Sequence, residues 1–431
     1  MACFDYCNSA DICYIKRILV RKMTLTIDTL IQQGLQNLRT TPGADVQERM
    51  RRVYRTISQQ AQPIVSEPVI VHWVGGQPLV WFPLGCHKFE TVGGCGPCDG
   101  YGKYHGYMTP EGKARELPAA IRRGLHELRL FGESQIQTGR TECAFNIGAA
   151  DTFRDCAFPS EQRRQLYQEV AQLITEFQER GLHASFLFET RLEQITERKL
   201  QELRDAVPQA IPISIGVGIE AADAFIRETL INKCYGSQAV QLLQQKVALA
   251  KRYAVDIEGH SLLGTPGLTE LDALASAVET TLAIHDAGST QVILMTANLK
   301  TGDSLATRLS HRGLYTLPSI HATVEALRYC TEQRQGIRIL PFGFAAAVPT
   351  LQYAQGCDAC TSRIKEGLDT YARICNIQGP AHATTYLREH YDTTFSCTCK
   401  NAWVDGLRRD AGSRLQERID SFVATACGVI A

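Results

Sequence analysis

The chain has 431 residues, 44% of them hydrophobic, which is enough to bury the core of one large α/β domain with an appendage or of two domains. Its 45 basic and 45 acidic residues balance, which excludes a global pull toward nucleic acid, and no apolar run is long enough to span a membrane. Sixteen cysteines in so large a chain, without a secretory signal pattern, indicate metal binding in a reducing, cytoplasmic compartment.

The first 66 residues are expected to lie outside the main fold. Residues 1–22 look unlike the rest of the chain, and Met23 offers an alternative start, so this leader is excluded from the fold prediction. Residues 24–62 are polar, with a helical pattern and no strand signal. We therefore expect a helical extension ahead of the first strand.

Helix and strand signals alternate along the central part of the chain. Short apolar runs bounded by turn residues predict strands, and a period of 3.6 residues between them predicts helices. The predicted strands are 68–74, 78–83, 141–147, 184–188, 211–219, 255–263, 291–296 and 337–340. The predicted helices are 117–131, one from the N-cap Ser160 to Gly181, 192–207, 237–253, one from the capping box Thr269-x-x-Asp272 to Asp286, and 320–335.

A strand followed each time by a helix implies a parallel sheet with the helices outside it. The predicted fold class is α/β: a partial (β/α)6-type TIM barrel over 67–345, a helical N-terminal extension over 1–66, and a small cysteine-containing helical region over 346–431. A doubly wound sheet is the alternative. In both folds the functional residues lie at the carboxyl ends of the strands.

Three cysteines directly follow the first barrel strand. They are Cys86, Cys95 and Cys98, spaced C-x8-C-x2-C. Three thiolates on one loop can bind three irons of a 4Fe–4S cluster, which leaves the fourth iron without a protein ligand. Such an open iron can bind a substrate or cofactor, as open positions do in other catalytic metal sites. The alternative is a zinc site completed by another ligand such as His87.

This loop resembles the cluster loop of radical SAM enzymes, with the long first gap typical of the branch that contains the elongator catalytic subunit. Later stretches resemble the same branch, and most closely the radical SAM subunit of archaeosine synthase. They are 187–191 (LFETR), 215–233 (IGVGIEAADAFIRETLINK), 262–270 (LLGTPGLTE), 298–305 (NLKTGDSL) and 313–318 (GLYTLP). The resemblance runs from about residue 80 to residue 403. The chain departs from it at Pro97, where most relatives carry an aromatic residue, and at 147–150 and 265–267.

The resemblance implies that the open iron binds S-adenosylmethionine, and that reductive cleavage of a C–S bond gives a 5′-deoxyadenosyl radical that abstracts hydrogen from the substrate. Among the residues implied to bind the cofactor, Glu220 has a carboxylate that can accept two hydroxyl hydrogen bonds. The full cofactor set is Gly148, Glu220, Arg227 and Lys233, and the substrate-side catalytic candidates are Glu189, Arg191, His260 and Asn298.

Ordinary structural roles are the alternatives for these residues. Gly148 can instead be an ordinary strand-end glycine, Glu220 can be an acidic residue at a helix N-terminus, and Arg227 can belong to a solvated helix face. The substrate-side candidates, each taken alone, read as polar groups satisfied within the fold.

A second group of cysteines lies near the C-terminus. Cys357 and Cys360 form one close pair, and Cys397 and Cys399 form another. Two close pairs far apart in sequence are typical of a tetrathiolate zinc site, and a second iron–sulfur cluster is the rival. The other scattered cysteines are predicted to be core or helix residues.

The sequence therefore predicts a radical SAM enzyme, a lyase or transferase that acts on a small molecule or a modified nucleobase. One alternative is archaeosine-synthase-like cleavage of a C–N bond in a lysine adduct of a tRNA deazaguanine base. Another is a non-catalytic α/β scaffold stabilised by zinc. The expected partners are the substrate and a reductant such as a flavodoxin or ferredoxin, with no membrane; the neutral charge does not indicate tRNA.

Overall fold

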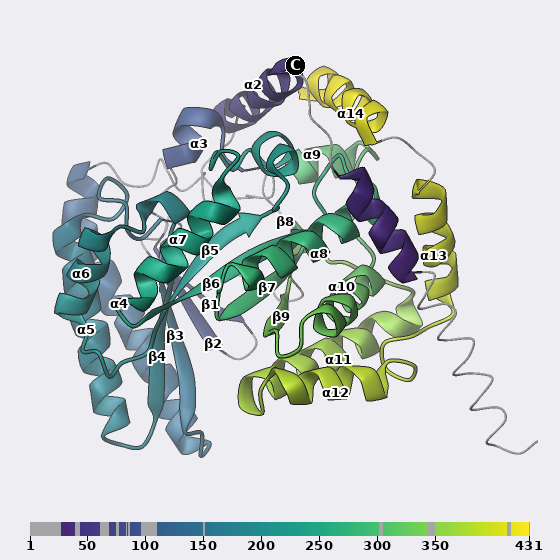
Figure 1. Ribbon diagram of the computed structural model, residues 1–431. Coiled ribbons are helices and arrows are strands. Elements are labelled where there is room, and N and C mark those ends of the chain that lie inside the picture. The colour runs from purple at the N-terminus through teal and green to yellow at the C-terminus, as the bar shows by residue number, and fades with distance from the viewer. Residues whose placement is uncertain are drawn as a thin grey trace, which may run out of the picture.

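The structure is a computed structural model, drawn in Figure 1. It describes residues 27–38, 44–60, 69–74, 77–82, 84, 87–95, 110–149, 151–300, 305–343, 350–411 and 415–430. The leader, Met23, Cys86 and Cys98 lie outside the described residues.

One eight-stranded sheet forms the centre of the molecule, and its strand order follows the chain, β1-β2-β3-β4-β5-β6-β7-β9. The first two strands form an antiparallel hairpin, and every later pairing is parallel. The strands are β1 (Ile70–Val74), β2 (Gln77–Trp81), β3 (Glu142–Gly148), β4 (His183–Glu189), β5 (Ile213–Glu220), β6 (Val255–Leu263), β7 (Gln291–Thr296) and β9 (Ile339–Phe342).

A helix crosses over between each successive pair of parallel strands. These helices are α4 (Pro110–Gln137), α5 (Ser160–Gln178), α6 (Glu197–Ala206), α7 (Ala239–Lys251), α8 (Glu270–Asp286) and α10 (Ile320–Gln333). Because the strand order never reverses, right-handed crossovers place all of these helices on one face of the sheet. The sheet is thus an open (β/α) barrel, as predicted, and the doubly wound alternative is wrong. In Figure 1 the helices follow one another from α5 and α6 on the left to α10 on the right.

The two faces of the sheet differ in burial. Along β4, Ala184, Phe186 and Phe188 point into the core beneath the helices and are buried. The alternate residues Leu187 and Glu189 are only half-buried, and β6 and β7 show the same alternation. Since a strand alternates its side chains between the two faces, the helix-free face of the barrel is the one that stays accessible.

Helices from both ends of the chain pack on the barrel helices. A helix over residues 27–37 shares a hydrophobic core with α8, α10 and the C-terminal helices α11 (Asp358–Ile377), α12 (Pro380–His390) and α13 (Cys399–Asp410). The last helix, α14 (Leu415–Ile430), packs against α2 (Ala44–Gln60). The domain boundaries near residues 66 and 345 stay a prediction.

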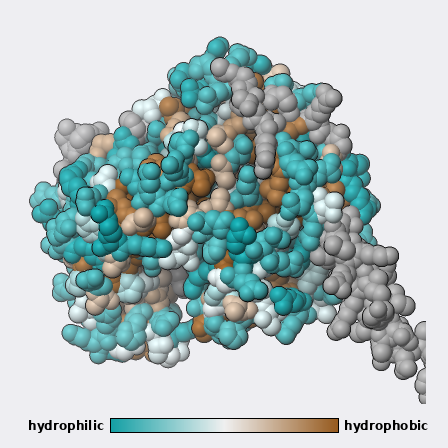
Figure 2. All heavy atoms as spheres, in the orientation of Figure 1, coloured by the Kyte–Doolittle hydropathy of each residue, from teal (hydrophilic) through white to brown (hydrophobic). Residues whose placement is uncertain are grey.

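The remaining short elements are α3 (His87–Val92), η2 (Leu192–Gln194), the π-helical turn η3 (Ile226–Leu230), α9 (Leu305–His311), and the antiparallel pair β8 (Leu299–Lys300) and β10 (Thr350–Gln352). Hydrophilic residues cover most of the face seen in Figure 2, with hydrophobic residues between the helices. Within the described ranges, no helix is long and apolar enough to cross a membrane.

Several predicted boundaries need correction. Ser160 is not an N-cap: Pro159 occupies that position, and the Ser160 hydroxyl donates to Glu202 instead. The helix predicted from residue 192 begins at Glu197, because Thr196 caps it by accepting from the Lys199 amide. The last barrel strand lies at Ile339–Phe342 rather than 337–340. The capping box at Thr269 is confirmed, since its side chain accepts from the Asp272 amide.

Candidate functional site

Glu189 and His260 meet across the middle of the accessible face. Glu189 ends β4 and pairs in register with Gly216 of β5, while His260 of β6 pairs with Gly218. A Cβ added at Gly216 would lie 3.1 Å from both the Glu189 Cγ and the His260 Nε2. The two side chains therefore converge over a strand that has no side chain at this point, and the structure brings together two of the predicted substrate-side residues.

Burial makes His260 a neutral imidazole at pH 7. Burial lowers its pKa to about 4, and the positive charge of Lys233 acts in the same direction. A neutral imidazole presents one donor and one acceptor nitrogen. His260 can thus donate one hydrogen bond and accept another on this face while it stays uncharged.

Glu220 and Lys233 form an ion pair over Gly218. The Lys233 Nζ donates to the Glu220 Oε1 at 2.7 Å, and both side chains are mostly buried. Burial lowers the pKa of Lys233, but the attraction of the Glu220 carboxylate, and of Tyr235 and Cys95 in their ionised forms, outweighs this effect and holds the pKa above its usual value. The Glu220 Oε2 is buried and has no hydrogen-bond partner among the described residues. Two of the predicted cofactor-binding residues therefore lie together, and one of their carboxylate oxygens is unsatisfied among the described residues.

Arg191 is buried beside this pair. Its Nε donates to Glu193 at 2.7 Å, its Nη2 donates to the Lys233 carbonyl at 2.6 Å, and its guanidinium stacks over the Tyr235 ring. Burial lowers the pKa of Arg191, but the attraction of Tyr235 and Cys95 in their ionised forms, and of the Glu193 carboxylate, holds it above its usual value. The side chain joins the end of β4 to the segment after η3, so its position is fixed by the fold.

The cysteine loop is attached to that same segment through Asn232, a residue the sequence analysis did not single out. The Asn232 Nδ2 donates to the carbonyls of Val92, at 2.9 Å, and of Gly94, at 2.6 Å. Gly93 has a φ of +90°, and a Cβ there would lie 2.3 Å from the backbone of Tyr54. Cys95 follows Gly94, and its thiol group interacts electrostatically with both Lys233 and Arg191.

The backbone around this attachment is strained. Glu220, Asn232 and Cys234 are three non-glycine residues with φ close to +60°. Each costs about 1 kcal/mol or more and persists only where the surroundings hold it, and such residues cluster at functional sites. The "INK" stretch quoted in the sequence resemblance was the available signal for Asn232. Its geometry could not be predicted from residue type alone.

Three predicted residues have roles inside the fold. Arg227 is fully buried and donates to the carbonyls of Ala221, Ala222 and Gly236 and to Glu228. The solvated helix face suggested for Arg227 is therefore wrong, and its donors are engaged in holding the loop after β5. A Cβ at Gly148 would lie 2.7 Å from the Thr152 Oγ1, so packing within the protein is enough to require glycine at this position. Asn298 donates to the Gly343 carbonyl at 3.3 Å.

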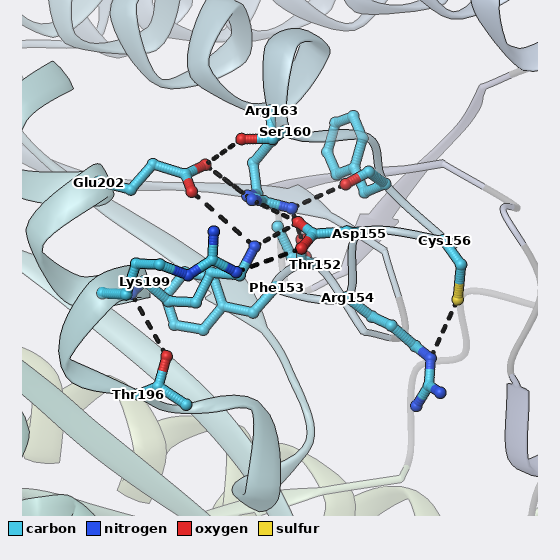
Figure 3. A network of polar contacts seen from close by, with 12 residues as sticks. Thr152, Phe153, Arg154, Asp155, Cys156, Ser160, Arg163, Thr196, Lys199 and Glu202 are labelled. Atoms are coloured by element: carbon cyan, nitrogen blue, oxygen red, sulfur yellow. Dashed lines mark hydrogen bonds and ion pairs between the residues drawn. The ribbon is translucent and has the colours of Figure 1, made fainter.

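Asp151, also missed by the sequence analysis, lies beyond the end of β3. It accepts from the Thr190 hydroxyl at 2.8 Å and from the Arg191 amide at 3.2 Å, and burial raises its pKa. Figure 3 shows the ionic network that holds the loop carrying it. At its centre, Arg163 is fully buried and donates to Glu202 at 2.7 Å, to Asp155 at 2.9 Å and to the Phe158 carbonyl at 2.7 Å.

The structure brings together all four C-terminal cysteines. The ligand atoms of Cys357, Cys360, Cys397 and Cys399 all lie within 4.8 Å of one another. Of the other cysteine group, only Cys95 lies within the described residues, as does the backbone of His87 but not its side chain.

Comparison with known proteins gives weak likenesses. No protein-family model matches the sequence. The uncharacterized protein MJ0550 of Methanocaldococcus jannaschii is 25% identical over 219 residues, which are 50% of this chain and 54% of that protein. The chain thus spans about half the length of this curated relative.

Three solved structures share parts of the architecture at low similarity. HydG, a maturase of the FeFe hydrogenase, is 11% identical with a TM-score of 0.39, and the match covers 97% of this chain and 96% of HydG. HemN of Escherichia coli, a coproporphyrinogen III oxidase described as a radical SAM enzyme, is 12% identical with a TM-score of 0.35, and the match covers 60% of this chain and 53% of HemN. TsrM of Kitasatospora setae, a radical S-adenosylmethionine methyltransferase, is 15% identical with a TM-score of 0.25, and the match covers 41% of this chain and 31% of TsrM. At these TM-scores the likenesses assign neither a family nor a reaction to this chain.

Proposed function

We propose that this protein is a radical SAM enzyme, in which Cys86, Cys95 and Cys98 bind a 4Fe–4S cluster whose open iron binds S-adenosylmethionine. The observation that carries the proposal is the pair of hydrogen bonds that the Asn232 side chain donates to the cysteine loop. It brings Cys95 to the carboxyl edge of an open (β/α) barrel, beside the charged residues at the ends of β4 and β5. That edge is where barrels of this type place their chemistry.

The described surroundings of Cys95 fit an iron–sulfur ligand. Thiolates are the ligands that iron–sulfur clusters use, and nearby positive charge favours the thiolate over the thiol. The cations Lys233 and Arg191 both interact with Cys95, and each is buried. When bound, the cluster would supply the electron that breaks a C–S bond of S-adenosylmethionine.

The pair over Gly218 fits the cofactor's polar groups. Lys233 fixes one oxygen of Glu220, so the other, Oε2, is oriented and ready to accept a hydrogen bond from a ribose hydroxyl or an ammonium group. The strand beneath carries glycine at both 216 and 218, which lets these side chains lie close to the backbone of β5. Glu189 and the neutral His260, over Gly216, are the proposed substrate-side groups.

The substrate class within this proposal is a small molecule or a modified nucleobase, and the reaction is that of a lyase or a transferase. Archaeosine-synthase-like cleavage of a C–N bond on tRNA is the alternative, supported by the stretch that ends at Asn232 and Lys233. The balanced net charge favours a small molecule, because neutral proteins lack the general attraction of tRNA binders. A salt-dependent gel shift with tRNA would support the alternative. A flavodoxin or ferredoxin is the proposed reductant.

The test is reductive cleavage of S-adenosylmethionine after anaerobic reconstitution with iron and sulfide. The wild type should release 5′-deoxyadenosine when a strong reductant is added, and a variant with alanine at Cys86, Cys95 and Cys98 should release none. Cys156→Ala, which removes an exposed thiol outside the loop, is the matched control and should behave as the wild type. Wild-type protein that binds zinc alone and forms no 5′-deoxyadenosine would instead support the non-catalytic zinc-stabilised scaffold.

A further inference from the structure

Two short cysteine turns face each other beside α10. In the first, the Cys360 amide donates to the Cys357 carbonyl at 3.0 Å as α11 begins. In the second, the Lys400 amide donates to the Cys397 carbonyl at 3.0 Å as α13 begins. Each turn therefore points two thiols in the same direction, and two helix N-termini, which favour negative charge, converge on the group.

The conformation of the first cysteine turn depends on glycine at position 356. A Cβ added at Gly356 would lie 2.6 Å from the Cys360 Sγ, closer than atoms pack. The Gly356 amide also donates to the Thr361 hydroxyl at 3.0 Å, and that hydroxyl donates to the Cys357 carbonyl at 3.0 Å. The turn is thus held from both sides in the form that exposes its two sulfurs to the other pair.

We propose that Cys357, Cys360, Cys397 and Cys399 bind one zinc ion as a tetrathiolate site. The sulfur of Cys357 lies 3.5 Å from that of Cys397, and the sulfur of Cys360 lies 3.5 Å from that of Cys399. Four sulfurs about 2.3 Å from one tetrahedral zinc lie about 3.8 Å from one another. Sulfurs that bind four different irons of a cluster must stand further apart than sulfurs that share one ion, so the spacing favours a single ion over a second cluster.

His321 acts as a positioning residue for this site. Its Nε2 lies 3.1 Å from the Cys399 Sγ, and the side chain is buried on α10. The Nδ1 has no hydrogen-bond partner among the described residues, which suits an unprotonated nitrogen. The Nε2 proton then points at the sulfur, and such a hydrogen bond to a ligand fixes its orientation and tunes the metal's affinity.

The zinc site adjoins a buried ionic network that reaches the N-terminal helix. Lys400, next to Cys399, donates to Glu325, which also accepts from Tyr391 and Arg328. Arg328 in turn donates to Asp28 of the helix over residues 27–37. One ion therefore fixes α11 and α13 against α10 and helps hold the charges that attach the N-terminal helix. This role is structural and independent of the function proposed above.

The experiment measures metal in the full-length purified chain. We expect one equivalent of zinc per chain, and zinc X-ray absorption that shows four sulfur neighbours at about 2.3 Å. Cys360→Ser should lose the zinc, whereas Cys375→Ala, which alters another buried cysteine on the same helix, should keep it. Alanine at Cys86, Cys95 and Cys98 should remove iron and leave the zinc, which separates this proposal from the radical SAM proposal.

Three results would overturn the zinc site. The first is zinc with nitrogen or oxygen neighbours in the wild type, a measurement that does not depend on any variant folding. The second is iron that survives alanine at the three loop cysteines and is lost with Cys360→Ser. The third is alkylation and mass analysis that find two disulfides among these four cysteines and no zinc.

Discussion

The side-chain amide of Asn232 donates to the carbonyl of Gly94, the residue before Cys95, at 2.6 Å. This bond joins the segment after β5 to the cysteine loop, which lie 138 residues apart in the chain. The same segment carries Lys233, whose ammonium pairs with Glu220. The geometry of the cysteine loop and that of the residues at the end of β5 are therefore set together.

Loss of the Asn232 amide should weaken cluster binding. Asn232→Asp and Asn232→Gly both tolerate the positive φ, but neither can donate to Val92 and Gly94. Each buried hydrogen bond contributes about 1 kcal/mol, so we expect iron to be lost to a chelator at least about 10-fold faster. The carboxylate should be worse than glycine, because it faces two carbonyl oxygens. The exposed variant Asn376→Asp should match the wild type; equal iron retention in all four proteins would contradict this role.

Glu220→Gln should weaken the binding of S-adenosylmethionine without removing iron. The substitution removes the charge that Lys233 pairs with and the charged acceptor Oε2. A hydrogen bond to a charged group contributes about 1.5–3 kcal/mol, so the dissociation constant should rise by about 10-fold or more. Equilibrium dialysis against S-adenosylmethionine measures this, with the exposed Glu197→Gln as control. An unchanged dissociation constant would remove Glu220 from the cofactor site.

His260 should make the protein less stable in mild acid. Its pKa is about 4 in the folded chain and about 6.5 when unfolded, so between these values the unfolded chain binds a proton that the folded chain does not. Stability from this residue is therefore complete above pH 6.5 and falls as the pH drops toward 4, by about 2 kcal/mol between pH 7 and pH 5. Denaturant unfolding at pH 7 and pH 5 should show that His260→Gln loses less free energy of unfolding between these pH values than the wild type does. Equal losses would place the imidazole in contact with water.

Arg163→Met should destabilise the fold by about 3 kcal/mol, because it leaves Glu202 and the Phe158 carbonyl without their buried donor. The neighbouring Arg164 is exposed, so Arg164→Met should change the free energy of unfolding by less than about 0.5 kcal/mol. Denaturant titration of both variants tests this. Similar values for the two would mean that the network in Figure 3 contributes little to stability.

The order of elements was largely predictable, because hydrophobic periodicity reports directly which residues face the core. The strands 255–263 and 291–296 match β6 and β7 at both ends. Predicted boundaries were wrong where a side chain acted locally. Thr196 caps α6, so the helix begins at Glu197, five residues after the predicted start. That choice depends on which of several polar residues meets a free amide, and residue type does not decide it.

The candidate site was predictable only in part. Glu189, Glu220 and His260 were proposed from their positions near strand ends, and Lys233 was proposed from the resemblance. All four gather on one face of the sheet. The resemblance implied a cofactor role for Arg227, with a solvated helix face as the alternative, yet Arg227 is buried against three backbone carbonyls of a tight loop. Asn232 and Asp151 act through long-range contacts to other loops, which no local pattern reveals.

The electron paramagnetic resonance spectrum of the reduced, reconstituted protein tests the central claim most directly. If three cysteines leave one iron open, adding S-adenosylmethionine must change the spectrum, because the ligand enters the coordination sphere of that iron. We predict a clear shift of the signal in the wild type, and no cluster signal once Cys95 is replaced by alanine. A reduced cluster whose spectrum is identical with and without S-adenosylmethionine would contradict the account.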